Sequence, residues 1–436
     1  MRVLMFGWEF PPHISGGLGT ACFGLTRGLA KHNVDMAFVV PKAFGDEDQS
    51  AVRLVPAEDI DVSHISVDLE EFWKKISYLE VGSNLVPYVG PEEFHRLVTE
   101  TELDRIDQHE DRTWHKFKFS GKYGKDLMKE VSRYAIIAGS IAAKEEFDII
   151  HAHDWLTYLA GITAKMVSGK PLVVHIHATE FDRSGENINQ AVYDIEKQGM
   201  EMADMVIAVS HLTRNIVINR YGIPEDKVVT VHNAVDFTGN DPCAGVTKKV
   251  PEKVVTFLGR ITFQKGPDYF VEAASKVLER YDNVRFVMAG SGDMLNRMIR
   301  RAAELEISHK FHFTGFLKGN EVNTMFAMSD VYVMPSVSEP FGISPLEAIK
   351  SNVPVIISKQ SGVAEVLRHA LKVDFWDIDA MADSIYGLLN YDALSKYFRR
   401  YGQDEVNNLK WENAALEVKK IYEMVLNGQQ PQFPSK

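Results

Sequence analysis

The feature that most restricts the fold of this chain is a short apolar run followed by a polar loop and a helical pattern, which recurs along most of the sequence. The runs in the first half are RVLMF, MAFVV, FDIIHAHDW, PLVVHIHA and MVIAVS, and those in the second half are KVVTFLG, VRFVMAG, KFHFTGF, VYVMPS and VPVIIS. Short apolar runs bounded by turn residues are typical of strands buried on both faces of a parallel sheet. The pattern therefore indicates α/β architecture, with helices covering parallel sheets.

The same pattern restarts near Val254, which indicates two doubly wound, Rossmann-like domains. Between them, residues 232 to 245 are rich in Gly, Asn, Asp and Pro, and we place the boundary near Phe237. The predicted units are a first domain (1–237), a second domain (238–405), a C-terminal helix (406–427) and a disordered tail (428–436).

Composition excludes several classes of protein. A net charge of -12 argues against nucleic acid as a general partner. Only Cys22 and Cys243 are present, which is too few for a disulfide framework and fits a reduced compartment. We find neither a signal sequence nor an apolar run long enough to cross a bilayer, and so expect a cytoplasmic protein.

Two cations converge on one loop of the second domain. Arg260 ends an apolar run, and Lys265 stands just before Gly266, Pro267 and a helical pattern. Ligands of open α/β sheets bind at the carboxyl ends of the strands, and a helix N-terminus there attracts anions. The pair therefore predicts a diphosphate site in a cleft between the domains, although two solvated charges on a surface turn give the same pattern.

The stretch SEPFGISPLEAI carries two glutamates. Prolines and a glycine between them exclude one continuous helix, so Glu339 is expected on a loop. Ser344 and Glu347 have the spacing of a capping box, which would give Glu347 a purely structural role. The amides of Gly342 and Ile343 would nevertheless point into the cleft, and a carboxylate beside them suits a hydroxyl donor such as ribose.

Further candidates lie in the first domain. The glycines of HISGGLGT, including Gly17, allow close approach of a ligand ahead of a helix, as they would also in a plain strand-to-helix turn. Asp154 and His177 each follow an apolar run, HAHDW and HIHATEFDR, which places both at the cleft.

The histidines of these two runs alternate, so each pair shares one face of its strand. The pairs are His151 with His153 and His175 with His177, and four neutral imidazoles could ligate zinc. Strand histidines are more often part of the core, however, and neither a cysteine ligand nor an HExxH motif accompanies them in sequence. We therefore expect no metal site.

The ordered set GGLGT, HDW, HIHATE, GRITFQKG and SEPFGISPLEA resembles the retaining GT-B glycosyltransferases, in particular the family-four enzymes and the related glycogen and starch synthases. The resemblance covers residues 1 to about 425. It implies two Rossmann-like domains facing across a cleft, an N-terminal one for the acceptor and a C-terminal one for the nucleotide-sugar donor. The helix around Trp411 resembles the terminal helix that crosses back onto the first domain.

For the donor, the resemblance implies that Arg260 and Lys265 hold the diphosphate, with Gly17 in a mobile glycine loop over the phosphates. Gly342 and Ile343 lie on the amide turn that faces these phosphates. Glu347 would accept the ribose hydroxyls. These roles need no resident cofactor, only the nucleotide-sugar substrate.

For catalysis, the resemblance implies that Glu339 sits beside the transferred sugar, His177 lies against the anomeric centre and Asp154 lies near donor and acceptor. Retention is expected through same-face attack without a divalent ion. A covalent role for Glu339 is the alternative.

The leading hypothesis is a glycogen synthase-like transfer of glucose from UDP- or ADP-glucose to an α-glucan. Alternatives are a family-four transferase with a lipid-linked or small acceptor, a GT-B epimerase, and a non-catalytic scaffold. Two departures bear on the choice: ISGGLG lacks the lysine that precedes the glycines of bacterial glycogen synthases, and residues 370–379 replace a common family run.

Residues 112–133 carry seven Lys or Arg against two acids, with interleaved aromatic residues. Such a segment could dock glucan or an anionic membrane, with glucan favoured, or be a plain solvated face. Sequence does not indicate an oligomeric state.

Overall fold

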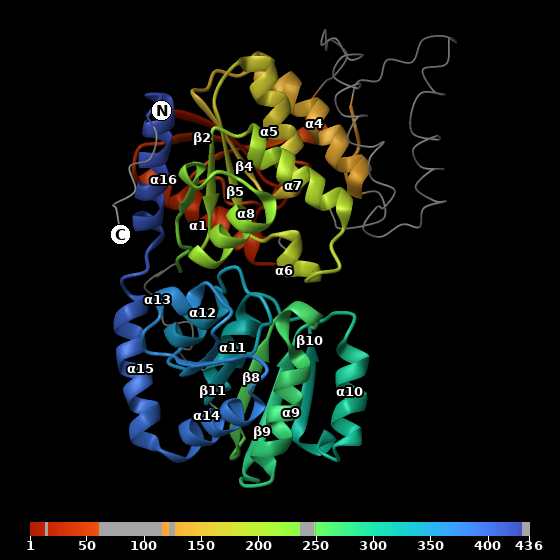
Figure 1. The fold of residues 1–436 in the computed structure, drawn as a ribbon, viewed down its shortest axis with the longest axis vertical. Helices are drawn as coiled ribbons and strands as arrows, with labels where there is room; N and C mark the ends of the chain where they lie inside the picture. Colours follow the sequence, from red (N-terminus) through yellow and green to blue (C-terminus); the bar gives the residue numbers. More distant parts are fainter. Residues whose placement is uncertain (14–15, 61–115, 122–126, 236–247, 249, 430–436) are drawn as a thin grey trace, which may run out of the picture.

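The protein consists of two α/β domains stacked end to end, each built on one parallel sheet (Figure 1). The computed structural model describes residues 1–436 except 14–15, 61–115, 122–126, 236–247, 249 and 430–436. The predicted fold class is confirmed. Phe237 and Cys243 lie outside the described residues.

The first sheet has the strand order β3-β2-β1-β4-β5-β6-β7, with all pairs parallel. Its strands are β1 (Arg2–Phe6), β2 (Asp35–Val40), β3 (Arg53–Pro56), β4 (Ile149–His153), β5 (Leu172–Ile176), β6 (Met205–Ala208) and β7 (Val228–Thr230). Four of these strands, β1, β4, β5 and β6, are buried throughout or nearly so, as the continuous apolar runs predict. The direction of winding reverses between β1 and β4.

Helices cover both faces of this sheet. They are α1 (Gly17–Lys31), α4 (Leu127–Lys144), α5 (Trp155–Ser168), α6 (Glu180–Ser184), α7 (Gln190–Met202) and α8 (His211–Tyr221), with 3-10 turns at Ala57–Asp59 and Glu225–Lys227. One core joins the sheet to α4, α5 and α7 around buried Tyr134 and Tyr158. The other joins it to α1 and the C-terminal helix α16 (Trp411–Leu426) around Leu25 and Trp411.

The second sheet has the order β10-β9-β8-β11-β12-β13, again all parallel. Its strands are β8 (Lys253–Leu258), β9 (Val284–Ala289), β10 (Phe311–Gly315), β11 (Val331–Met334), β12 (Val355–Ser358) and β13 (Leu371–Val373). Its helices are α9 (Pro267–Leu278), α10 (Leu295–Glu304), α11 (Asn320–Met328), α12 (Ser344–Lys350), α13 (Val363–Val366), α14 (Ile378–Asn390) and α15 (Asp392–Val406), with 3-10 turns at Phe263–Lys265 (η3) and Ser308–Lys310. The winding reverses between β8 and β11.

The chain returns to its first domain at the end. Helix α15 ends at Val406, and α16 runs back along α1, as Figure 1 shows in blue and red. Two glycines make the close approach possible. A Cβ on Gly24 would lie 2.2 Å from Nε1 of Trp411, and one on Gly28 would lie 2.6 Å from the Trp411 carbonyl oxygen. The crossing helix predicted around Trp411 is therefore present.

Among the helices that the structure describes, none combines the length and the apolar composition needed to cross a bilayer.

Candidate active site between the two sheets

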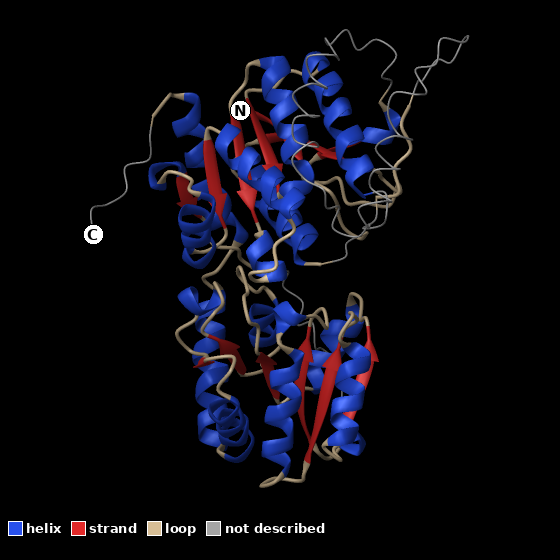
Figure 2. Ribbon diagram, turned by 45° about the vertical axis from the view of Figure 1, so that its right-hand side comes forward, coloured by secondary structure: helices blue, strands red, loops and turns tan. Residues whose placement is uncertain are grey.

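The candidate residues lie on loops that leave the carboxyl ends of strands at the two reversal points. In Figure 2 the arrowheads of both sheets are directed toward the region between the domains. Loops after β1 and β4 approach from the first domain, and loops after β8 and β11 from the second. Ligands of doubly wound sheets bind at such points.

The loop after β8 is fixed by backbone contact. Gly290 at the end of β9 has φ +144, and a Cβ there would lie 1.8 Å from the Gly259 carbonyl oxygen. Gly266, with φ +64, sits against the Pro335 carbonyl and leads into Pro267, the first residue of α9. Because glycine alone fits these positions, the loop that carries Arg260 and Lys265 has a defined shape.

The two cations of this loop have different surroundings. Arg260 is exposed, and its guanidinium donates a 3.4 Å hydrogen bond to Oε1 of Gln264. Lys265 is partly buried and forms an ion pair with Glu339, which lies after β11. Ser336 donates a 3.2 Å hydrogen bond to the same carboxylate oxygen. Glu339 is only 6% exposed, so the Lys265 ammonium is its main charge partner.

Two of the predicted residues are therefore in direct contact. Lys265 and Glu339 are 74 positions apart, and sequence did not reveal their pairing. The backbone N–H of Glu339 donates to the Gln360 carbonyl at 3.0 Å, which holds this loop against β12. The expectation that Glu339 lies on a loop is met.

The predicted capping box at α12 is wrong. The helix begins at Ser344 itself, Ile343 occupies the N-cap position with helical backbone angles, and no side chain caps it. The Ser344 hydroxyl instead bonds the hydroxyl of Tyr332 on β11 at 2.8 Å. The Ser344 hydroxyl, which the local pattern predicts to cap the helix, is instead used in a tertiary hydrogen bond.

This correction leaves Glu347 without its predicted structural partner. The carboxylate makes no side-chain hydrogen bond within the described part of the chain, and burial raises its pKa. Gly342 has φ +96, and a Cβ placed at this position would lie 3.2 Å from Cγ of Glu339. The turn Gly342–Ile343 thus joins the Glu339 loop to the start of the helix that carries Glu347.

In the first domain, Asp154 holds the loop that carries His177. Its Oδ1 accepts hydrogen bonds from the backbone N–H of His177 at 2.6 Å and of Ala178 at 3.4 Å. Asp154 is 7% exposed and has φ +59. The Nε2 atom of His177 faces Nδ1 of His153 at 3.0 Å. Both predicted residues therefore belong to one hydrogen-bonded unit at the carboxyl ends of β4 and β5.

A buried ionic network anchors the same loop from behind. Arg183 donates to the Ala178 carbonyl at 2.7 Å and to Glu196 at 2.8 Å. Glu196 also accepts from the Tyr221 hydroxyl, and burial raises its pKa to about 7. Sequence reasoning did not identify this network.

The two domains are in contact around these loops. Ser338, next to Glu339, donates a 2.5 Å hydrogen bond to Asp182 of α6. The capping box of α6, in which Thr179 and Asp182 bond reciprocally, fixes Asp182. Its T-x-x-D pattern could have located this helix start from sequence, but not the partner across the cleft.

A second contact lies beside the first. Glu365 on α13 accepts hydrogen bonds from the backbone N–H groups of His211 at 2.9 Å and Leu212 at 2.8 Å, at the start of α8. Its Oε2 also lies 2.7 Å from Nε2 of His232. Nearby, the Thr213 hydroxyl lies 3.4 Å from the Pro340 carbonyl.

Gly17 lies at the start of α1, after an extended Gly16, and a Cβ at either position would meet no atom of the described residues within 4 Å. Residues 14–15, which precede them, lie outside the described residues.

The four histidines form a stacked ladder on one face of β4 and β5, as their alternation predicts. Ring centroids are 4.2 Å apart for His151 and His153 and 4.4 Å for His175 and His177. The rings of His151 and His175 are almost parallel, at 6°. Ligand atoms of His151, His153 and His175 lie within 4.8 Å of one another, but the lone pairs of the nearly parallel His151 and His175 rings do not converge on one ion. Burial lowers the pKa of each histidine in the ladder.

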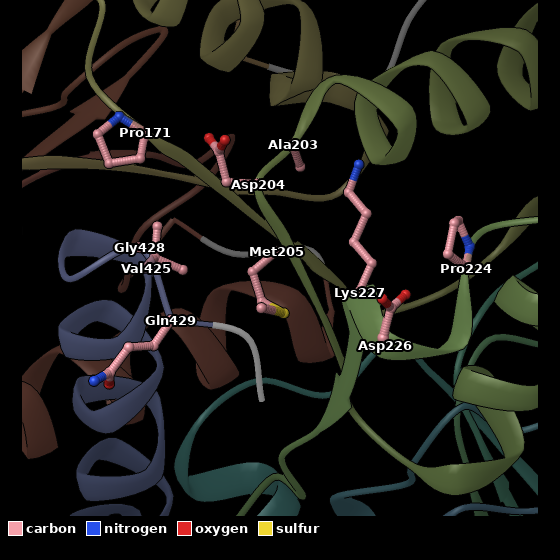
Figure 3. A pocket seen from close by; sticks show the side chains of 10 residues that line it. All are labelled: Pro171, Ala203, Asp204, Met205, Pro224, Asp226, Lys227, Val425, Gly428 and Gln429. Carbon is pink, nitrogen blue, oxygen red and sulfur yellow. The ribbon is translucent and has the colours of Figure 1, made fainter. Parts of the chain in front are cut away.

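A cavity of about 480 Å³ lies away from this site (Figure 3). It is bordered by Pro171, Met205 and Lys227, at the amino ends of β5, β6 and β7. Two of the charged groups labelled in Figure 3 are engaged with the protein: Asp204 accepts from the Leu172 N–H at 2.7 Å, and Lys227 donates to the Glu201 carbonyl at 2.7 Å. The predicted site residues lie elsewhere, at the carboxyl ends of the strands.

The basic aromatic segment is described only at residues 116–121 and 127–133. There Phe119 is buried, and Phe117 packs against the core with Arg133 over its ring. Part of the aromatic pattern is therefore core. Residues 370–379 form β13 and the Asp377 cap of α14, leaving Trp376 56% exposed.

Facing Rossmann-like domains, with cations and carboxylates at the strand ends between them, define the class of GT-B transferases. The model for "Glycosyl transferases group 1" matches residues 244–405, and that for "Glycosyltransferase Family 4" matches residues 102–238. The chain belongs to the family-four GT-B glycosyltransferases.

Relatives extend over the full chain. An uncharacterized glycosyltransferase of Methanocaldococcus jannaschii is 28% identical and covers 98% of this chain and 99% of its own. The glycogen synthase of Mycobacterium tuberculosis is 22% identical, and the match covers 100% of this chain and 98% of that protein. Sucrose-phosphate synthase from Thermosynechococcus elongatus has the same fold, with a TM-score of 0.71 at 16% identity. The match covers 98% of this chain and 100% of the synthase. HepE of Anabaena, solved with UDP and glucose, has a TM-score of 0.65 at 15% identity, with 97% and 99% covered.

Proposed function

We propose that this glycosyltransferase is a retaining hexosyltransferase that moves glucose from UDP- or ADP-glucose to an α-glucan, as a glycogen synthase does. The observation that carries the proposal is the contact between Lys265 and Glu339 at the carboxyl ends of β8 and β11. It joins a cation suited to a diphosphate to a carboxylate suited to the adjacent sugar.

Cleavage of the bond between sugar and phosphate places negative charge on the diphosphate. A diphosphate at this loop competes with Glu339 for the Lys265 ammonium, and Arg260 is exposed and able to turn toward it. Preorganised cations that meet developing charge contribute a large part of catalysis in such reactions. The amides of Gly342 and Ile343, and those of the Gly17 turn, would add donors to the phosphates.

Release from Lys265 leaves Glu339 available to the sugar. Its carboxylate would accept hydroxyl hydrogen bonds and stabilise the positive charge that develops at the anomeric carbon. The carboxylate of Glu347, which makes no side-chain hydrogen bond within the described residues, would accept the ribose hydroxyls. Each of these two carboxylates then has one defined ligand group.

On the opposite side, His177 would contact the donor sugar near its anomeric centre. Asp154 positions it through the 2.6 Å bond to its backbone N–H. We assign same-face attack, in which the leaving phosphate accepts the proton of the incoming hydroxyl. None of these steps requires a divalent ion, and the reducing environment implied by the cysteine content fits a cytoplasmic reaction.

An α-glucan is the acceptor we favour, supported by the full-length similarity to a glycogen synthase. Other relatives, such as the D-inositol 3-phosphate glycosyltransferase of Salinispora tropica, act on different acceptors by name. The acceptor is thus the part of the proposal that experiment must decide first.

The test incubates the enzyme with UDP-glucose or ADP-glucose, with and without glycogen, in EDTA. We expect glycogen-dependent release of the nucleoside diphosphate, longer chains, and an α-linkage by proton NMR. Donor turnover only with inositol phosphate or a lipid-linked sugar would move the enzyme to the alternative acceptor class, and no turnover with any acceptor would contradict the assignment.

A further inference from the structure

Three potential metal ligands from three separate elements meet beside the cleft. Cys22 lies on α1, His153 ends β4 and His177 follows β5. One ligand atom of each lies within 4.8 Å of the others. No cysteine ligand accompanies the histidines in sequence, but the fold brings Cys22 close to them.

The spacing within this group differs from that of the stacked ladder. Nδ1 of His153 and Nε2 of His177 face one another at 3.0 Å, with their rings tilted by 38°. Two nitrogen ligands of tetrahedral zinc, each about 2.0–2.1 Å from the ion, are roughly 3.3 Å apart. The two imidazoles are therefore near their ligating separation, and small ring rotations would turn both lone pairs toward one ion.

The surroundings favour a cation. Cys22 is 1% exposed and His153 is fully buried. The outer nitrogens of the two rings, Nε2 of His153 and Nδ1 of His177, have no hydrogen-bond partner among the described residues, so ring rotation would break only the bond between the two imidazoles. The carboxylate of Asp154 accepts a hydrogen bond from the backbone N–H of His177 at 2.6 Å, so it places negative charge beside the three ligands. Negative charge at this position attracts a divalent ion.

Entry is possible from one side. His177 is only partly buried, on the loop that faces the second domain. Three protein ligands leave one tetrahedral position for water, which is the pattern of an open rather than a closed zinc site. The Asp154 bond to the His177 backbone keeps this loop in place.

We propose that Cys22, His153 and His177 form an inhibitory site for a thiophilic divalent cation, represented by Zn²⁺. Binding breaks the S–H bond of Cys22, forms a zinc–sulfur bond and releases the proton to solvent. The proton that joins Nδ1 of His153 to Nε2 of His177 moves to the outer nitrogen of its own ring, so that both facing nitrogens donate lone pairs to the ion. The ion takes His177 away from the donor sugar, so the inhibitory effect rests on the role proposed above for His177. Zinc binding itself does not depend on that role.

Binding is measured first, with Co²⁺ as a spectroscopic probe of the metal-stripped enzyme. We expect a sulfur-to-cobalt charge-transfer band with one equivalent of Co²⁺, displaced by Zn²⁺. Cys22→Ser should abolish the band, and Cys243→Ser is the matched control that should keep it. His153→Gln should weaken zinc affinity at least tenfold, measured by competition with a chelator.

Inhibition is measured next, as donor turnover at rising free Zn²⁺. Cys22→Ser should raise the inhibitory concentration at least tenfold, with thermal melting used to confirm that it is folded. Absence of the cobalt band, or a band that survives in Cys22→Ser, overturns the site. A normal band with equal zinc sensitivity in both proteins overturns the inhibition. A band from an enzyme with no transferase activity supports the metal site and contradicts the proposed function instead.

Discussion

The ammonium group of Lys265 is paired with the carboxylate of Glu339, across the reversal point of the second sheet. In the proposed complex, the diphosphate would bind the Lys265 ammonium and the sugar would bind the Glu339 carboxylate, so the donor would break this ion pair. Because Glu339 is almost fully buried, removal of the neighbouring cation would leave a buried carboxylate without its ion-pair partner.

Removing this cation should chiefly impair the chemical step. We expect Lys265→Ala to lower kcat/KM by a factor of about 10² to 10³, as loss of one charge-stabilising donor does in other enzymes. Lys276→Ala is the control, because Lys276 also pairs with a carboxylate, Asp379, but on the outer surface of the same domain. Equal activity of the two variants would remove Lys265 from the site.

Gly24 is a test of how the last helix docks. A methyl group at this position meets the indole of Trp411, so Gly24→Ala should destabilise the fold by roughly 1–3 kcal/mol through overpacking. Gly387→Ala on α14 is the matched control: its Cβ would lie 3.6 Å from the nearest atom, Cδ2 of Leu394, and the change should be neutral or slightly stabilising. Thermal melting of the two variants compares them. A Gly24→Ala protein as stable as the wild type would show that α16 shifts freely.

The buried histidine ladder predicts loss of stability in acid. Burial lowers the pKa of His151 and His175 below 6.5 in the folded protein, so these rings bind protons on unfolding when the pH is below about 6.5. Above that pH, these rings should not affect the free energy of unfolding. At lower pH, the free energy of unfolding should decrease by up to about 1.4 kcal/mol per pH unit for each ring. Melting temperatures between pH 5 and 8, in chelator, measure this dependence.

A single substitution isolates the effect. His175→Gln should flatten the acid dependence relative to the wild type, whereas His312→Gln, at an exposed position on β10, should leave it unchanged. Identical slopes in all three proteins would contradict the assignment to the ladder.

Glu365 should hold the second domain against the start of α8. Glu365→Ala removes the acceptor for two backbone N–H groups and the partner of His232, so the amides of His211 and Leu212 should exchange roughly 10- to 100-fold faster. Glu304→Ala, which breaks an exposed pair with Arg301, is the control. Hydrogen exchange followed by mass spectrometry reports both, and unchanged protection at α8 would mean that the contact contributes nothing.

Sequence was sufficient for the parts of the fold that depend on local pattern. Continuous apolar runs predicted the strands, and their polar ends placed Asp154 and His177 on one edge of the first sheet. Alternation in the two histidine runs predicted the shared face that the rings occupy. These features follow from the period of a strand and need no knowledge of the rest of the chain.

Features that depend on distant partners could not be predicted in this way. The hydroxyl of Ser344 bonds Tyr332 instead of capping its helix. Asp182 and Ser338 are 156 positions apart, and their bond exists only because the two domains meet there. Cys22 reaches the histidines because α1 packs on the face of the sheet that carries them, a relation that spacing along the chain does not encode.

The packing of α16 on α1 has a consequence for how the protein is made. Residues Gly17–Lys31 are synthesised before the second domain, whereas their partner, Trp411–Leu426, is synthesised after it. The apolar face of α1 that packs against Trp411 therefore stays uncovered by α16 throughout translation of the second domain. Contacts between such remote segments form slowly, and exposed apolar surface of this kind favours aggregation of the nascent chain.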